Sequence, residues 1–362
     1  MLKEKIFLFL FLIVIIISFI IFVAPYSLSP YPILMGGDFK QERQYPPYIK
    51  GIYLNSWTAN SSAKINHFIE LINKTELNAV IIDIKEVDGI IAIDNIISNT
   101  KELIDKLHQN NIYAIARIVV FKDDALTKIK PELALKNRSG GLWRDFRGMT
   151  WLDPASKEVW DYHVEIAKEA IKIGFDEINF DYVRFPSDGD ISKIVYPIWD
   201  GNTPKSEIIK QFFTYLNKEL KPTGAFLSVD LFGLTLWREN GDDMNIGQIL
   251  ENAMPYFDYI CPMVYPSHYP SGFENYNNPA DHPYEIIKIN LEKGQERVAN
   301  SNAMPAGRQA KLRPWLQDFD MGAIYDAKMI NLEKQAVYDT NSYGWLMWNA
   351  ASNYTEDALE RY

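Results

Sequence analysis

Short apolar runs recur along the chain from residue 50 onward. They occupy residues 51–56, 79–85, 112–121, 174–189, 225–232, 259–265, 314–319 and 343–350. Runs of this length that are rich in β-branched and aromatic residues are typical of strands. The second run, AVIIDIK at 79–85, is nearly all apolar, which predicts a strand that is buried on both faces.

Helical spacing of apolar residues recurs between these runs. The helical segments are residues 61–75, 100–109, 156–173, 204–220, 284–292 and 324–338. Alternating strands and helices indicate a parallel α/β architecture, and eight strands favour a (β/α)8 TIM barrel over an open sheet. We expect the barrel to span residues 49–362, with residues 266–280 as a surface loop.

The amino-terminal segment has a different pattern. Lys3 and Lys5 precede an almost entirely apolar run at 6–24, which is close to the ~20 residues that span a bilayer and lacks an A-x-A cleavage pattern. Residues 1–24 are therefore predicted to be an uncleaved signal anchor, a transmembrane helix that places the rest of the chain on the extracytoplasmic side. The alternative is cleavage, which would make the protein secreted. Residues 25–48, rich in Pro, Gly and Tyr, are expected to be a linker.

One stretch, GFDEINFDYVRFPSDG at residues 174–189, carries charged residues within a strand pattern. Asp181 and Arg184 lie near its carboxyl end, where Pro186 and Gly189 end the strand. In an α/β barrel, catalytic side chains lie at the carboxyl ends of the strands. A carboxylate and a guanidinium in this position need partners, so they are expected either to serve a ligand or to form a pair that only braces the barrel mouth.

Polar side chains recur at the ends of the other predicted strands as well. A barrel interior is filled mainly by branched apolar residues, so this many polar groups at one rim predict an active-site pocket, as against a rim that is merely solvated. The candidates are Asp83, Lys85, Glu86, Arg117, Asp181, Arg184, Asp230, Tyr265, Gln317, Asp318, Trp348 and Asn349.

The composition narrows the choice of ligand. A net charge of −10 and the lack of a Lys/Arg cluster argue against a nucleic-acid partner. Aromatic residues make up 14% of the chain, and aromatic faces stack on sugar rings, although Trp and Tyr are also ordinary core residues. The five His form no H-x-H or H-E-x-x-H pattern, so no metal site or cofactor is predicted. Cys261, the single cysteine, falls in an apolar run and is expected to be buried.

Carboxylates at neighbouring strand ends suit glycoside cleavage. This reaction needs an acid for the leaving oxygen and a second carboxylate as nucleophile or base, about 5–5.5 Å away for retention and about 6.5–9.5 Å for inversion. Adjacent strands are about 4.8 Å apart, so Asp181 and Asp230 on the fourth and fifth strands could meet either spacing. Asp181 is assigned as nucleophile or base and Asp230 as general acid. Because Asp230 precedes Gly233, a cap or turn role is its alternative.

The other candidates are assigned to substrate binding. Three carboxylates are alternatives to the two catalytic acids. Two arginines would keep a neighbouring carboxylate ionised, and three aromatic residues would bind a sugar ring. In that order they are Asp83, Glu86 and Asp318; Arg117 and Arg184; and Trp151, Tyr265 and Trp348. For Trp151, which lies in the loop after the third strand, packing on the barrel is an equal alternative.

Residues 174–187, GFDEINFDYVRFPS, resemble the hallmark of a bacterial barrel family, a domain of unknown function described as a putative glycosyl hydrolase. The resemblance includes Trp151-Leu152-Asp153-Pro154, the strand at 79–85 and the Trp-rich last strand, and it covers roughly residues 48–350. It implies a barrel of the glycoside hydrolase type, although similarity of fold does not by itself establish activity.

A more distant similarity is to the chitinase family, whose fourth strand carries D-G-x-D-x-D-x-E with the catalytic Glu at its end. The matching run here is DEINFDYV at residues 176–183, and Val183 takes the place of that Glu. Met263-Val264-Tyr265-Pro266 is similar to the family's M-x-Y-D, with Pro266 in place of Asp. These departures argue against the substrate-assisted chitinase mechanism and leave Asp181 as the acid retained on this strand.

We therefore expect a membrane-anchored, extracytoplasmic barrel that hydrolyses glycosidic bonds in a cell-surface or secreted polysaccharide or oligosaccharide. The main alternative is a non-catalytic carbohydrate-binding barrel of the cell envelope, favoured if Asp181 and Asp230 are each locked to an arginine and shielded from solvent. A third hypothesis is a metal-dependent hydrolase that uses Asp83, Asp181 and Asp230, although the scarcity of His argues against it.

Overall fold

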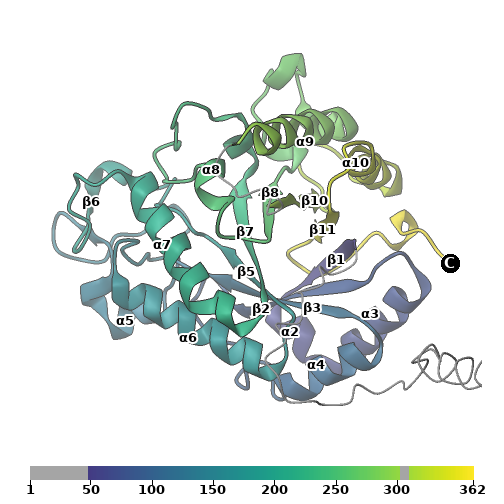
Figure 1. The fold of residues 1–362 in the computed structure, drawn as a ribbon, viewed down its shortest axis with the longest axis horizontal. Helices are drawn as coiled ribbons and strands as arrows, with labels where there is room; N and C mark the ends of the chain where they lie inside the picture. The colour runs from purple at the N-terminus through teal and green to yellow at the C-terminus, as the bar shows by residue number, and fades with distance from the viewer. Residues whose placement is uncertain (1–47, 302–309) are drawn as a thin grey trace, which may run out of the picture. The chain divides into compact units, whose positions relative to one another are not determined.

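The structure, a computed structural model, describes residues 48–301 and 310–362. Its strands are β1 (Ile49–Leu54), β2 (Ala79–Lys85), β3 (Tyr113–Val119), β5 (Glu177–Asp181), β7 (Phe226–Phe232), β8 (Tyr259–Met263), β10 (Trp315–Gln317) and β11 (Gly344–Trp348). These eight strands are parallel, and each pairs with the next one along the chain (Figure 1). Pairing of β11 with β1 and of β8 with β10 closes the ring, so the predicted TIM barrel is confirmed. A two-residue strand, β9 (Lys311–Leu312), also pairs with β8.

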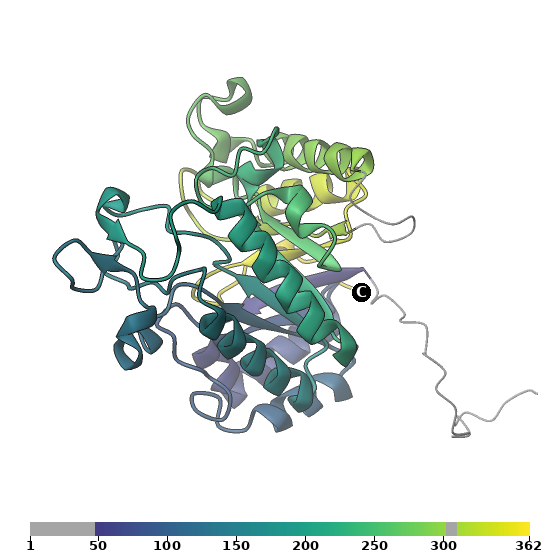
Figure 2. The same ribbon diagram turned by 60° about the vertical axis from the view of Figure 1, so that its left-hand side comes forward.

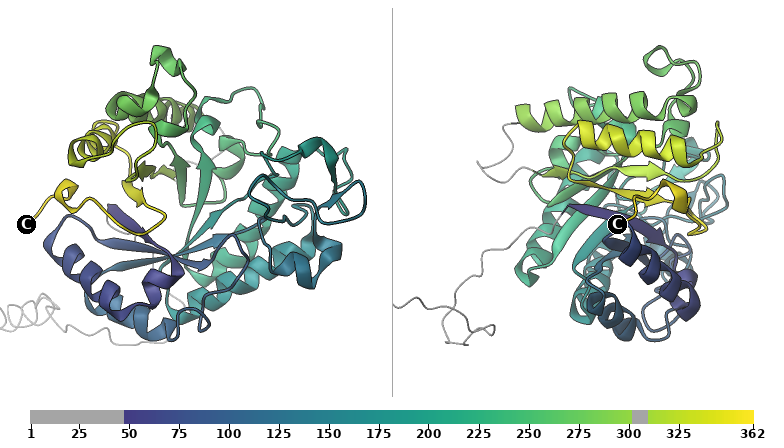
Figure 3. Two further views of the ribbon diagram at one scale, coloured as in Figure 1. Left: turned by 180° about the vertical axis from the view of Figure 1, so that it is seen from behind. Right: turned by 90° about the vertical axis from the view of Figure 1, so that its right-hand side faces the viewer.

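Helices cover the outside of the barrel. They are α2 (Ser56–Asn60), α3 (Ser62–Lys74), α4 (Thr100–Gln109), α5 (Leu126–Ile129), α6 (Lys157–Ile173), α7 (Lys205–Leu220), α8 (Leu250–Ala253), α9 (Pro283–Asn300) and α10 (Ala327–Asp339). Figure 2 shows α7 beside α6, and the right-hand view of Figure 3 shows α9 beside α10. Strands β4 (Lys136–Asn137) and β6 (Ile194–Val195) join the loop after β3 to the loop after β5.

Two helices differ from their predicted limits. α9 continues well beyond residue 292, and Gly294 does not end it, because a glycine here allows close packing: a Cβ atom would lie 2.8 Å from Leu312 Cδ1. α10 begins at Ala327 instead of residue 324. The reason is a cap, since the Asp326 carboxylate accepts hydrogen bonds from the first backbone N–H groups of the helix.

Alternate residues of each strand face the barrel interior or the helices. The interior holds a small apolar core that includes Ile81, Ile115 and Cys261, and the burial predicted for Cys261 is confirmed. A larger apolar core lies between the strands and the helices. The interior also contains polar side chains, because β5 directs every second residue inward from Glu177 to Asp181.

The predicted anchor, residues 1–24, lies outside the described residues, as does the predicted linker at 25–48 apart from Tyr48. Among the helices of residues 48–301 and 310–362, none has the length and hydropathy needed to cross a bilayer.

Candidate active site

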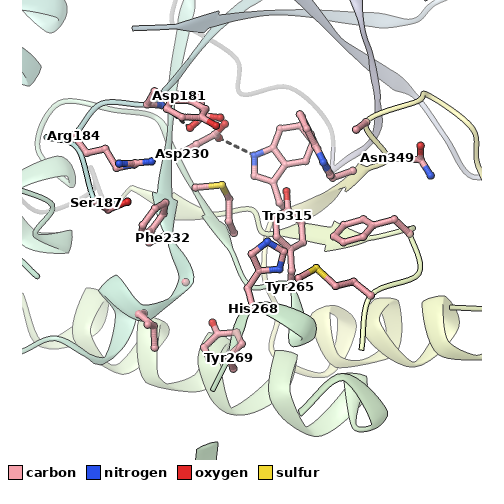
Figure 4. Close-up of a pocket in the computed structure, with 18 of the residues that line it drawn as sticks. Asp181, Arg184, Ser187, Asp230, Phe232, Tyr265, His268, Tyr269, Trp315 and Asn349 are labelled. Atoms are coloured by element: carbon pink, nitrogen blue, oxygen red, sulfur yellow. Dashed lines mark hydrogen bonds between the residues drawn. The ribbon is translucent and has the colours of Figure 1, made fainter. Parts of the chain in front are cut away.

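A cavity of about 760 Å³ opens at the carboxyl ends of the strands (Figure 4). The strands contribute Arg117, Asp181, Asp230, Phe232, Met263, Trp315 and Trp348. The loops contribute, among others, Arg147, Arg184, Ser187, Asp188, Tyr265, His268, Phe319 and Asn349. This is the end of the barrel at which (β/α)8 enzymes carry their active sites.

Arg117, on the inner face of β3, holds three carboxylates together. Its Nη1 donates to Asp83 Oδ1 and its Nη2 to Asp181 Oδ2, each at 2.5 Å. Its Nε lies 3.8 Å from Asp230 Oδ2. Burial alone would lower the pKa of Arg117, but the surrounding carboxylates, led by Asp83 and Asp181, raise it well above its ordinary value. The guanidinium is therefore a fixed positive charge that these acids share.

Asp230 lies on β7, next to β5, and only 1% of it is exposed. Its Oδ1 accepts a hydrogen bond from Asn179 Nδ2 at 2.8 Å. It also accepts one from Trp315 Nε1 at 2.8 Å (Figure 4). Burial, followed by the nearby charge of Asp181, raises the pKa of Asp230 well above its ordinary value, against the opposing effect of Arg117. Asp230 therefore keeps its proton at a higher pH than an ordinary aspartate does.

Asp181 ends β5 and has a different environment. Besides the bond from Arg117 Nη2 to its Oδ2, its Oδ1 accepts the backbone N–H of Tyr182 at 2.6 Å, so both of its oxygens have donors. Tyr182 has a φ of 55°, a left-handed conformation that costs a non-glycine residue about 1–2 kcal/mol. The chain thus turns sharply just after Asp181, and a strained residue is held beside the cavity, as is common at functional sites.

Aromatic rings form one wall of the cavity. The ring of Trp348 lies 4.1 Å from that of Tyr53 and meets Trp315 edge to face at 5.6 Å. Tyr265 lines the cavity as well (Figure 4). Burial, followed by the neighbouring acidic residues, raises the pKa of Tyr265 well above its ordinary value, so its hydroxyl stays protonated and can donate to a ligand.

Arg184 also lines the cavity, but the predicted alternative of a pair with Asp181 does not form. Asp181 is bound to Arg117 instead. In the part of the chain that the structure describes, the guanidinium of Arg184 makes one hydrogen bond, from Nη1 to the backbone oxygen of Phe185 at 3.1 Å. Arg184 is therefore not a brace for the catalytic candidates.

A family model described as Putative glycosyl hydrolase domain (DUF4015) matches residues 51–354. The chain belongs to this family. The match runs from β1 past β11 and includes every residue that lines the cavity. The resemblance to this family is thereby confirmed.

Two solved structures support the fold of this family member, and a third is similar in sequence to part of the chain. The glycoside hydrolase domain of PgaB (BpsB) from Bordetella bronchiseptica has a TM-score of 0.60 at 11% identity, covering 84% of this chain and 95% of that one. TtGalA, an α-galactosidase from Thermus thermophilus, has a TM-score of 0.54 at 10% identity, covering 85% of this chain and 59% of that one. A hypothetical protein from Ruminiclostridium thermocellum ATCC 27405 is 41% identical over 49% of this chain and 96% of that one, with a TM-score of 0.44. No curated protein compared with the chain matches it.

Three predicted reserve carboxylates, Asp83, Glu86 and Asp318, do not line the cavity. Each is held by protein groups. Asp83 is bound to the Arg117 guanidinium, Glu86 Oε1 accepts from the N–H and hydroxyl of Ser56, and Asp318 accepts from the N–H and hydroxyl of Thr355. Their polar partners satisfy them away from the cavity, so the structure places them as supports of the rim.

Trp151 is fully buried and packs on the barrel, with its ring under the guanidinium of Arg184. The packing alternative therefore describes Trp151, whose ring is also contacted by Lys122 and Tyr182. Asp153 of the same motif accepts the backbone N–H groups of Ile198 and Trp199 at 2.8 and 2.9 Å. This part of the motif ties the long loop after β5 to the start of α6.

Two residues that orient Asp230 were not singled out from the sequence. Asn179 and Trp315 both donate to Asp230 and fix its orientation. Asn179 could have been found from the sequence, because residues 177, 179 and 181 lie on the same face of a strand. Trp315 likewise lies two residues from the candidate Gln317, but its contact with Asp230 depends on the pairing of a three-residue strand, which the sequence does not show.

Across residues 48–301 and 310–362, no group of three His, Cys, Asp or Glu side chains is placed to hold a metal ion. Asp83, Asp181 and Asp230 surround the Arg117 guanidinium instead. The metal-dependent alternative thus lacks the ligand set on which it was based.

Proposed function

We propose that this protein hydrolyses glycosidic bonds in a polysaccharide or oligosaccharide bound in the cavity, with Asp230 as general acid and Asp181 as nucleophile or base. The observation that carries the proposal is the contrast between these two acids. They lie on adjacent strands near one guanidinium, yet burial raises the pKa of Asp230, whereas Asp181 accepts hydrogen bonds from Arg117 and from the Tyr182 backbone N–H. Paired-carboxylate catalysis requires two neighbouring carboxyl groups of which one holds a proton and the other does not.

In this mechanism the glycosidic oxygen takes the proton of Asp230 as its bond to the anomeric carbon breaks. Asp181 either attacks that carbon directly or removes a proton from a water that attacks it. After direct attack, water hydrolyses the bond between the sugar and Asp181 and gives its proton to Asp230. After attack by water, Asp181 holds the proton of that water, and exchange with solvent returns a proton to Asp230 and removes the one on Asp181. Arg117 stabilises the negative charges before and after this transfer, and Tyr265 and Trp348 shape the sugar subsite.

The place of the reaction follows from the predicted anchor. A transmembrane helix at residues 1–24 would hold the barrel on the extracytoplasmic side, where cell-surface and secreted polysaccharides occur.

One observation favours the second candidate, a carbohydrate-binding barrel without catalysis. Asp181 is 6% exposed and Asp230 is 1% exposed, and both lie against Arg117. Both nevertheless belong to the wall of a cavity of about 760 Å³, which is large enough for sugar residues, so we favour the hydrolase.

The test is hydrolysis of a panel of bacterial envelope polysaccharides and exopolysaccharides by the purified full chain, read by released reducing ends. Asp181→Asn is assayed alongside, with Asp105→Asn, an exposed aspartate of α4, as the matched control. Product from the wild type and the control but not from Asp181→Asn is expected. Absence of product, together with retained binding to one polymer, would support the carbohydrate-binding barrel.

A further inference from the structure

The guanidinium of Arg184 is buried and faces the cavity. Only 6% of the residue is exposed, and Figure 4 shows the guanidinium extending toward the centre of the cavity, above Ser187 and Phe232. Arginine carries five N–H donors in a planar fork. Within residues 48–301 and 310–362, the bond to the backbone oxygen of Phe185 uses one of them. Most donors of this buried cation are therefore free for a ligand.

Aromatic faces contact this guanidinium, and the carboxylates near it, Asp181, Asp188 and Asp145, form no ion pair with it within the described residues. The rings of Trp151, Tyr182 and Phe232 lie 4.9, 5.2 and 4.7 Å from its central carbon. Such cation–π contacts stabilise a positive charge without using its hydrogen-bond donors. Burial lowers the pKa of Arg184, against the opposing effects of Tyr182, Asp181, Asp188 and Asp145, but an arginine remains charged in a protein.

The other two arginines inside the barrel are different. Arg117 contacts three carboxylates, and Arg313 binds Glu177 through both of its terminal nitrogens. A buried charge without a partner is strongly unfavourable. Arg117 and Arg313 both have carboxylate partners, whereas Arg184 has no ion pair among the described residues. A free charge at a cavity wall is expected where the missing anion arrives with the ligand.

The shape of the group indicates which anion fits. A guanidinium binds a carboxylate or sulfate through two parallel N–H donors, a geometry that a neutral sugar hydroxyl cannot match. Ser187 lies beside it on the cavity wall, and its hydroxyl can donate a further hydrogen bond (Figure 4). Asp181, the catalytic candidate nearest to Arg184 in the sequence, is already bound to Arg117.

We propose that Arg184 binds an anionic substituent of the substrate, the carboxylate of a uronic acid or a sulfate ester, so that the cavity selects acidic glycans. This inference rests on the proposed function, because it names the substrate class of the same site. It assigns Arg184 to specificity, whereas Asp181 and Asp230 carry the reaction.

The experiment compares matched probes by calorimetry on the purified full chain. One pair is a tetragalacturonate and the same tetrasaccharide with its carboxylates reduced to alcohols; the other is a sulfated galactose tetrasaccharide and its desulfated form. The acidic member of at least one pair is expected to bind about 10- to 100-fold more tightly, the range for one charge-assisted contact. The pair that shows the difference identifies the anion as carboxylate or sulfate.

Variants assign the preference to one residue. Arg184→Met keeps an apolar stem against the three rings and should remove the difference within the pair. Arg147→Met removes an exposed positive charge from the same cavity and should preserve it, because a diffuse charge effect is not what the structure predicts. If Arg184→Met does not fold, Arg184→Lys takes its place and should bind the acidic probe about tenfold more weakly than the wild type.

Three results would overturn the inference: no preference in either pair, no binding of any probe, or a preference that the Arg184 variant retains. Reducing ends released from the same probes are measured separately. An Arg184-dependent preference without hydrolysis would leave the inference standing and count against the proposed hydrolase. Hydrolysis of neutral glycans without any acidic preference would do the reverse.

Discussion

Two buried arginine–carboxylate groups lie inside the same barrel, one at each end. At the amino end of β5, Glu177 and Arg313 are both fully buried, and the arginine binds both carboxylate oxygens. At the carboxyl end, Arg117 contacts three carboxylates, two of which line the cavity. The residue types are the same, but the first group is balanced and closed whereas the second has more acids than bases and opens to a cavity.

The difference shows which buried charges are available for chemistry. A closed pair with one carboxylate for one guanidinium satisfies itself and supports the barrel. An excess of acids around one guanidinium forces one of them to keep a proton, which is the condition for acid catalysis. Burial and residue type alone do not separate the two roles; the ratio of charges and access to the cavity do.

The largest effect is expected from Asp230→Asn at the open end. Asparagine keeps the hydrogen bonds from Asn179 and Trp315 but has no proton to give, so hydrolysis of ordinary glycosides should fall by about 10²–10⁴-fold. Dinitrophenyl glycosides, whose leaving group needs no proton, should be cleaved at close to the wild-type rate. Steady-state kinetics on both substrate types give the result, and equal losses on both would contradict the role of Asp230 as the acid.

Glu177→Gln should break the closed end. Removal of the carboxylate leaves Arg313 buried and uncompensated, which is expected to cost about 3–5 kcal/mol in the free energy of unfolding. Urea denaturation measures this loss, with Glu165→Gln on the exposed face of α6 as a control that changes little. Activity per folded molecule should be preserved, because Glu177 does not line the cavity. A stable but inactive variant would mean that the two ends are not separate.

The pH dependence of hydrolysis should report on Asp230. Its raised pKa means that the reactive, protonated form is present at low and intermediate pH and is lost as the pH rises through that value. The rate on unactivated glycosides should therefore decline about tenfold per pH unit on the alkaline side, and Asp230→Asn should lack this limb. A wild-type rate that continues to climb with pH would argue against an acid at this position.

Replacing both members of the closed pair tests whether it is needed at all. Glu177→Leu combined with Arg313→Met removes both charges together, so no uncompensated ion remains. The double variant should lie within about 2 kcal/mol of the wild type, of either sign. Urea unfolding compares it with Glu177→Gln, and a double variant as unstable as that single one would show that the pair does more than neutralise itself.

The smallest effect concerns Glu333, a buried carboxylate of α10 without an arginine. Its Oε2 accepts the Gln317 backbone N–H at 2.8 Å, and its Oε1 has no hydrogen-bond partner among the described residues. Burial raises the pKa of Glu333 well above its ordinary value, so the folded state holds a proton that the unfolded state releases, and stability falls as the pH rises between the two values. Glu333→Gln should remove this decline and stabilise the protein by about 1 kcal/mol at pH 8, with little change at pH 4. Urea unfolding curves of the wild type and the variant at both pH values measure this difference. An equal change in stability at pH 4 and pH 8 would show that protonation of Glu333 is not its cause.

The sequence predicted the limits of strands and helices well where a local signal, an apolar run or a capping residue, marks them. β2 and α4 have the limits expected from the sequence, since one is a continuous apolar run and the other begins directly after Asn99, whose side chain caps it. The neighbouring positions of Asp181 and Asp230 were also predictable, because successive parallel strands of a barrel lie side by side.

The contacts between side chains were less predictable than the places of those side chains along the strands. On a continuous strand, Asp181 and Arg184 would face opposite sides, but β5 ends at Asp181 and the left-handed Tyr182 turns the chain so that both reach the cavity. Trp151 lies in the loop after β3, whereas Arg184 lies in the loop after β5. Only the folded structure shows that the guanidinium of Arg184 lies over the ring of Trp151.

The sequence by itself determined the order of strands and helices and the kinds of side chain collected at their carboxyl ends, because hydrophobic periodicity is a local property of the chain. Tertiary structure alone decided which carboxylate binds which guanidinium, that burial raises the pKa of Asp230, and that most donors of Arg184 make no hydrogen bond to the described residues. The physical reason is that these contacts depend on strand register and on one turn, which bring together side chains from elements far apart in the chain.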